Sequence, residues 1–222
     1  PKKFFFVSAL TGISTMAFLT LDFILAKHYL TPNEAGAYAL LSTVGKMVFF
    51  LGSLGNQFIL PLISHEEGAK GNSLKTFYMV LIATFILSLS GFIAFSVFGE
   101  QFLTQPFLFG DKILPVLPYL IPFGFAMLCF TVSRSFVYYY MAKKVYLVPL
   151  IASGFALLQF VLISFAHSSI GMIVASMLIV GGLNLIFMIG MHLGSKYVMM
   201  FESNVADFLG LFSKDEEKRV GS

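Results

Sequence analysis

The chain has 222 residues, of which 58% are hydrophobic and 11% are charged. A soluble domain carries about 25% charged residues, so this composition excludes an ordinary soluble enzyme or binding module and indicates an integral membrane protein. The net charge of +3 comes from Lys and Arg beside the ends of apolar segments, where such residues orient a membrane protein, so we expect no nucleic-acid partner. The one cysteine, Cys129, excludes a disulfide framework.

Six apolar stretches are long enough to cross a lipid bilayer, which needs about 20 helical residues. They cover residues 4–29, 36–64, 74–98, 115–141, 145–166 and 170–193, and turn-forming residues separate them. No alternating β-barrel pattern is present, and helices are then the spanning structure that satisfies the backbone. The sequence therefore predicts an all-α integral membrane domain over residues 1–195 with six transmembrane helices.

The last part of the chain, residues 196–222, has a different pattern. Apolar residues recur at helical spacing on one face, at Tyr197, Phe201, Val205, Phe208 and Phe212. This periodicity predicts a cytoplasmic interfacial helix followed by a charged tail. A solvated tail is the alternative.

The positive charges predict the orientation of the six spans. If loops are sorted alternately, one side receives Lys27 and Lys112, and the other receives Lys2, Lys3, Lys70, Lys75, Lys143, Lys144, Lys196, Lys214, Lys218 and Arg219. Cytoplasmic loops carry the excess of Lys and Arg, so both termini are predicted to be cytoplasmic in a multi-pass protein of the cytoplasmic (inner) membrane. A cleaved signal peptide is not expected, because the first apolar run is too long and contains Asp22. The start at Pro1 indicates a fragment or a processed chain.

Three full charges lie well inside the apolar stretches, away from their ends: Asp22, Lys46 and Arg134. A charge at the centre of a membrane helix costs about 2.5–3.5 kcal/mol on insertion scales, so it faces a protein interior or a hydrated cavity. Asp22 shares a helical face with Ser8, Thr11 and Thr15, and Lys46 shares one with Ser42, Ser53 and Gln57. At a rise of 1.5 Å per residue, Lys46 lies about 15 Å and Asp22 about 10 Å from the outer end, which allows an ion pair between neighbouring helices.

These polar stripes have two interpretations. They join helices by hydrogen bonds, with Asp22 and Lys46 as a structural salt bridge, or they line a hydrated cavity. In a cavity, Lys46 and Arg134 would bind an anionic substrate such as a phosphate, with Ser42 and Gln57 beside them. Asp22 would pair with Lys46 or bind a coupling cation. Arg134, which we expect to share a face with Thr131, Ser135 and Tyr138, has the alternative of extending to the inner headgroups.

Signals for an enzyme are weak. The sequence has no Gly-rich phosphate loop, no paired-His helix motif and no Gly-x-Ser-x-Gly elbow, and its loops are too short for a catalytic domain. The four histidines lie far apart near the ends of spans, so we expect no metal site and no cofactor. A lipid-modifying membrane enzyme is a minor alternative.

One region carries a recognisable pattern. It reads LDFILAKHYL at residues 21–30, TPNEAGAY at 31–38 and STVGK at 42–46. The combination resembles the seventh and eighth helices of the polysaccharide (lipid-linked oligosaccharide) flippases, a family of the multidrug/oligosaccharidyl-lipid/polysaccharide exporter superfamily. Weaker resemblance continues through Pro61, Phe109-Gly110 and residues 140–144 to Gly171. At the start of the last helix, where the family often has a Gly-Ala pair, this chain has Gly171-Met172.

The resemblance implies the mouse-virulence-factor type transporter fold, in which two six-helix lobes face each other across a cavity. It also implies that the protein flips an undecaprenyl-diphosphate-linked oligosaccharide across the cytoplasmic membrane by alternating access. Lys46 would take the family's cationic position and Asp22 the acidic position that opens the motif, whereas Arg134 matches no family motif. Because this chain has one lobe, we expect the N-terminal six-helix lobe upstream or on a partner chain.

Several alternatives stay open at this point. A homodimer of half-transporters would also supply two lobes. A drug/cation antiporter of the same superfamily would have mainly acidic residues in its cavity, whereas here two buried cations face one acid. A lipid II flippase shares the fold class, and a non-transporting membrane assembly subunit would use the polar stripes only to join helices.

Overall fold

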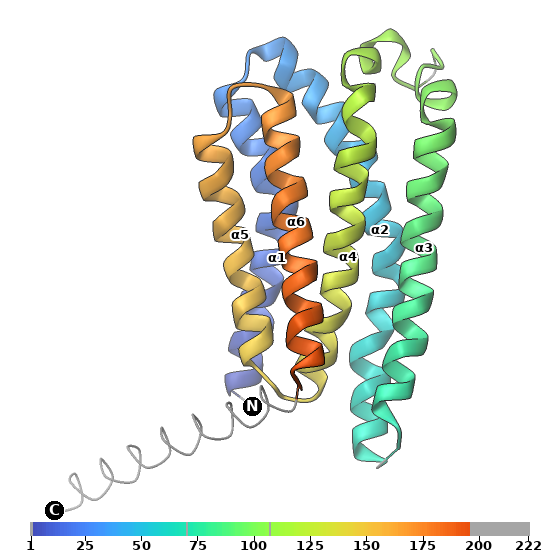
Figure 1. The fold of residues 1–222 in the computed structure, drawn as a ribbon, viewed down its shortest axis with the longest axis vertical. Helices are drawn as coiled ribbons and strands as arrows, with labels where there is room; N and C mark the ends of the chain where they lie inside the picture. The colour runs from blue at the N-terminus through green and yellow to red at the C-terminus, as the bar shows by residue number, and fades with distance from the viewer. Residues whose placement is uncertain (1, 70, 107, 196–222) are drawn as a thin grey trace, which may run out of the picture.

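Six long α-helices run side by side with alternating direction in the computed structural model, which describes residues 2–69, 71–106 and 108–195 (Figure 1). They are α1 (Lys2–Tyr29), α2 (Pro32–Gly68), α3 (Ser73–Leu103), α4 (Leu120–Ala142), α5 (Leu147–Phe165) and α6 (Ile170–Leu193), with a 3₁₀ helix, η1 (Gly110–Tyr119), before α4. All of the described helices except η1 are long and apolar enough to cross a membrane, and η1 together with α4 forms the fourth candidate span. The predicted all-α architecture with six helices long and apolar enough to cross a membrane is confirmed.

Some of the observed helix ends differ from the predicted ends of the spans. α2 has 37 residues and continues to Gly68, beyond the predicted end at residue 64. The fourth span begins as η1 because Pro115 and Pro118 remove backbone donors, and the α-helix starts at Leu120 rather than at residue 115. The sixth span has the predicted limits.

Side-chain caps explain why the helices start where they do. Thr31 caps α2 in a reciprocal arrangement with Glu34, and Pro32 occupies the first turn. Asn72 accepts a hydrogen bond from the backbone N–H of Lys75 at the start of α3, and Ser169 caps α6. The turn-forming residues seen in the sequence therefore act as helix caps.

The helices form two groups that meet along α4 and α6. α1 packs mainly against α5, whereas α2 packs mainly against α3 and α4, and α4 has a further extensive contact with α6. The start of α1, the α2–α3 turn, the α4–α5 turn and the end of α6 lie at one end of the bundle (Figure 1). The loops are thus sorted between the two ends as the charge pattern requires.

The α4–α6 contact depends on a small residue. A Cβ atom added to Gly181 would lie 2.9 Å from the backbone oxygen of Ala126 on α4, whereas one added to the adjacent Gly182 would have nothing within 4 Å. Of these two glycines, Gly181 is the one that permits close helix approach. The interfacial helix predicted for residues 196–222 lies outside the described residues.

Candidate functional site

A buried carboxylate lies at the junction of α1 and α2. Asp22 on α1 is fully buried, and its Oδ1 lies 2.9 Å from the Nζ of Lys46 on α2. Its Oδ2 accepts hydrogen bonds from the Tyr38 hydroxyl at 2.9 Å and from the Ser42 hydroxyl at 3.2 Å. The ion pair expected from the depths of Asp22 and Lys46 is present, and its role in a substrate site stays a prediction.

The sequence of α2 explains this arrangement. Tyr38, Ser42 and Lys46 are spaced by four residues, so their side chains lie along one stripe of the helix. The short connection after Tyr29 turns α2 back along α1, and the stripe then faces Asp22. Sequence reasoning missed Tyr38 as a site residue, although its spacing from Ser42 and Lys46 was a usable signal.

The Asp22 network balances its own charge. One carboxylate faces one ammonium, and two neutral hydroxyls supply the other donors. The Lys46 side chain keeps 11% of its surface exposed, whereas the Asp22 side chain is fully buried. An ammonium group can in general bind a phosphate oxygen as well as a carboxylate, and a carboxylate can bind a proton or a cation.

The other polar residues predicted on the α2 stripe do not join this network. Gln57 is exposed, and the Ser53 hydroxyl donates to the backbone oxygen of Phe50 on its own helix. The neighbouring Asn56 is buried instead. Its Nδ2 donates to the Thr131 backbone oxygen on α4 at 3.1 Å, and its Oδ1 accepts from the Ser135 hydroxyl at 2.6 Å. Asn56, which sequence reasoning missed, therefore joins α2 to α4.

Arg134 lies apart from the Asp22 network, inside the bundle. It is 5% exposed, its guanidinium lies 4.8 Å from the centre of the Tyr138 ring, and one terminal nitrogen donates to the Tyr138 hydroxyl at 3.2 Å. Thr131 and Ser135, expected to share its face, contact Asn56 on α2 instead. The side chain is enclosed by helices, so the alternative that it extends to the headgroups does not describe this structure.

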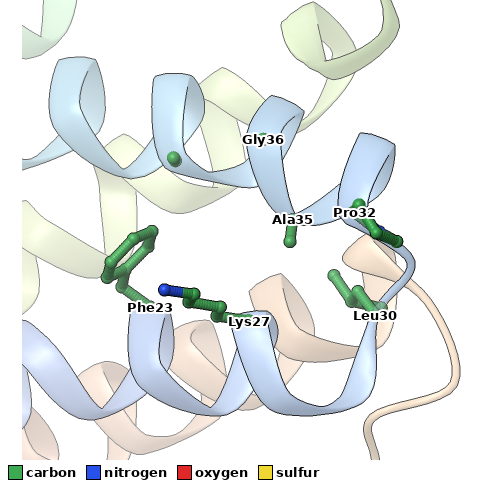
Figure 2. A pocket seen from close by; sticks show the side chains of 7 residues that line it. Phe23, Lys27, Leu30, Pro32, Ala35 and Gly36 are labelled. Atoms are coloured by element: carbon green, nitrogen blue, oxygen red, sulfur yellow. The ribbon is translucent and has the colours of Figure 1, made fainter.

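A groove opens between α1 and α2 near the turn that joins them. It has a volume of about 360 Å³, and its lining is apolar except for the amino group of Lys27. Figure 2 shows the Lys27 side chain extending toward Phe23 in the space between the two helices. Lys27 is exposed and lies five residues after Asp22, so the groove places a second cation on the same helix hairpin.

The opposite end of the bundle holds a second polar cluster. The two ring nitrogens of His192 on α6 lie 2.9 Å from the Tyr78 hydroxyl and 3.1 Å from the Tyr140 hydroxyl. Nearby, Lys143 forms an ion pair with Glu67 at 3.2 Å. Burial lowers the pKa of the Lys143 ammonium, but its neighbours, Glu67 among them, outweigh burial and raise the pKa above its ordinary value. Within the described residues, no group of His, Cys, Asp and Glu is arranged to hold a metal ion.

The fold and composition define the class of the protein as a six-helix membrane protein. Comparisons with models of known protein families, with curated proteins and with solved structures find no match.

Proposed function

We propose that this chain is one lobe of a flippase that moves an undecaprenyl-diphosphate-linked oligosaccharide across the cytoplasmic membrane by alternating access. The observation that carries the proposal is the buried Asp22–Lys46 pair within the motif region that resembles polysaccharide flippases. In this proposal Lys46 attracts the diphosphate, and Asp22 neutralises Lys46 when no substrate is bound.

The position of the pair supports an exchange of partners. All three donors to Asp22 come from α2, so movement of α2 relative to α1 would release them together. Contacts between α1 and α2 are few compared with those of α1 with α5 and of α2 with α3. A weakly packed helix pair joined by a polar network is suited to a rocking motion.

The groove beside Lys27 adds a second cationic position on the same hairpin. An apolar groove with one ammonium group complements a lipid diphosphate, which combines an anionic head with an apolar tail. The facing lobe of the transporter, supplied by an N-terminal six-helix unit of the same protein or of a partner, would complete the cavity. Both termini are cytoplasmic in this proposal.

A second candidate function is a non-transporting membrane assembly subunit. The observation that favours it is the complete pairing of Asp22, whose two oxygens have three donors within the chain. In that case the network would only join α1 to α2. The two functions differ in whether the charge of Lys46 is needed once the fold is formed.

The test is translocation by the protein expressed from its complete coding region and reconstituted in lipid vesicles. The substrate is a fluorescent undecaprenyl diphosphate that carries a short oligosaccharide, and loss of its fluorescence to an external quencher reports its movement. We expect Lys46→Gln to slow translocation about tenfold or more, because a charge-assisted hydrogen bond contributes about 1.5–3 kcal/mol. Lys46→Arg keeps the charge and should retain more of the rate.

The matched control is Lys112→Gln, which removes one exposed cation from η1. It should translocate at the rate of the unmodified protein. A Lys46→Gln protein that is folded in equal amount and translocates at the unmodified rate would remove Lys46 from the substrate site. Absence of translocation by the unmodified protein would favour the assembly subunit.

A further inference from the structure

A small polar cavity lies where α1, α4, α5 and α6 meet. Its polar lining consists of Ser14 and Thr15 from α1, Arg134 from α4 and Asn184 from α6, and the rest is apolar. Arg134 and Asn184 are 5% and 1% exposed. The Nε of Arg134 and the Oδ1 of Asn184 have no hydrogen-bond partner among the described residues. Two buried polar groups thus face one cavity with hydrogen-bonding capacity unused.

The charge of Arg134 is also uncompensated. The ion pairs within residues 2–69, 71–106 and 108–195 are Asp22–Lys46 and Lys143–Glu67, and neither includes Arg134. The phenol ring of Tyr138 offers a cation–π contact and a neutral acceptor, which do not balance a full positive charge. A buried charge without a counter-ion is unfavourable by several kcal/mol, so an anion bound beside Arg134 would stabilise the folded chain.

The size of the cavity limits which anion can bind. It has about 10 Å³ of space for a particle the size of water, which is room for one monatomic ion or one water molecule. Phosphate and carboxylate groups are too large. The hydroxyl of Ser14 and the amide NH₂ of Asn184, after a half-turn of the amide, can donate to an anion beside the Arg134 Nε–H.

We propose that this cavity is a binding site for one chloride ion, which neutralises Arg134 and joins the four helices. The site does not depend on the proposed transport activity. It separates Arg134 from the substrate diphosphate, because the cavity, with about 10 Å³ of space for a particle the size of water, is far too small for a lipid headgroup.

The experiment measures the Tm of the purified full chain in lipid nanodiscs at equal concentrations of sodium chloride, sodium bromide and sodium gluconate. Chloride and bromide are single spherical anions, whereas gluconate is a much larger organic anion. We expect the two halides to raise Tm by about 2–4 °C over gluconate, with a saturable dependence on concentration. A single water molecule in the cavity would leave Tm equal in the three salts and would overturn the proposal.

Three variants locate the effect. Arg134→Met removes the charge, and Asn184→Leu fills the cavity while keeping every charge; both should lose the difference between halide and gluconate. Lys112→Met, which removes an exposed cation elsewhere, should keep it. If Arg134→Met fails to fold, Asn184→Leu decides alone. A halide effect that persists at full size in Asn184→Leu would show that the ion binds elsewhere and would overturn the assignment.

Discussion

The α1–α2 junction and the cavity beside Arg134 hold the buried charges in opposite states. At the junction, both oxygens of Asp22 have donors, and the charge of Lys46 is balanced at 2.9 Å. In the cavity, the Nε of Arg134 has no partner among the described residues, and no carboxylate there forms an ion pair with it. In both regions the charge lies among polar residues on an apolar helix, so the sequence alone does not show which charge is paired.

The difference separates two uses of a buried charge. A balanced pair is stable without a ligand, so a substrate must compete with Asp22 for Lys46. An unbalanced cation favours whatever anion fits beside it, and a ligand there adds to stability. The junction therefore fits the proposed exchange of partners, whereas the cavity fits the proposed resident ion.

The strongest test of this comparison removes one charge from the balanced pair. Asp22→Ala leaves Lys46 without a counter-ion, and we expect it to lower the free energy of unfolding by about 3–5 kcal/mol. Asp22→Asn combined with Lys46→Met removes both charges and keeps an acceptor for Tyr38, so it should recover most of that loss. Reversible unfolding in mixed micelles measures both. A single substitution that costs less than about 1 kcal/mol would contradict a balanced buried pair.

The hydroxyl donors to Asp22 should have graded effects. Tyr38→Phe removes the shorter bond, at 2.9 Å, and should cost about 1.5–3 kcal/mol, as for hydrogen bonds to charged groups. Ser42→Ala removes the longer bond, at 3.2 Å, and should cost about 0.5–1.5 kcal/mol. The same unfolding measurement compares them. A larger loss for Ser42→Ala than for Tyr38→Phe would show that the hydrogen bonds rank differently.

Paired glycine substitutions test the close contact between α4 and α6, the two helices that carry Arg134 and Asn184. Gly181→Ala places a methyl group 2.9 Å from the Ala126 backbone oxygen and should cost about 1–3 kcal/mol, because α6 must move away from α4. Gly182→Ala is the matched control, with nothing within 4 Å, and should stabilise α6 by about 0.5–1 kcal/mol. Thermal unfolding in nanodiscs measures the difference. Equal effects of the two substitutions would contradict the close α4–α6 contact.

The smallest effect is expected at the ion pair outside the core. The side chains of Lys143 and Glu67 are 24% and 43% exposed, so water and salt screen their interaction. Glu67→Gln should change the free energy of unfolding by less than about 1 kcal/mol. The effect should shrink further between low and high salt in the same assay. A cost as large as that of Asp22→Ala would remove the distinction between buried and exposed pairs.

The spans and the ion pair follow from the sequence because they depend on local patterns. Length and hydropathy define six spans, and helical rise places Asp22 and Lys46 near the same depth. Ser42 was predicted on the same stripe as Lys46, and Tyr38, which sequence reasoning missed, has the same four-residue spacing. These features need no knowledge of how distant helices pack.

The remaining features depend on contacts between distant helices. Gln57 was predicted to line the site and lies exposed, while Asn56, one residue and about 100° away on the helix, is buried against α4. Arg134 faces α1, α5 and α6 rather than α2, because α4 packs extensively on both sides. Helical spacing shows which residues share a face of a helix. It does not show which neighbouring helix packs on that face.

We propose that Lys46 and Asp22 act on a lipid diphosphate as well as joining α1 to α2. The most direct test is the translocation rate of the Asp22→Asn/Lys46→Met protein in vesicles, because that protein lacks both charges and should keep its fold. We expect a free energy of unfolding within about 1 kcal/mol of the unmodified protein and translocation slowed about tenfold or more. Translocation at the unmodified rate would show that the pair only holds the helices together and would contradict the claim.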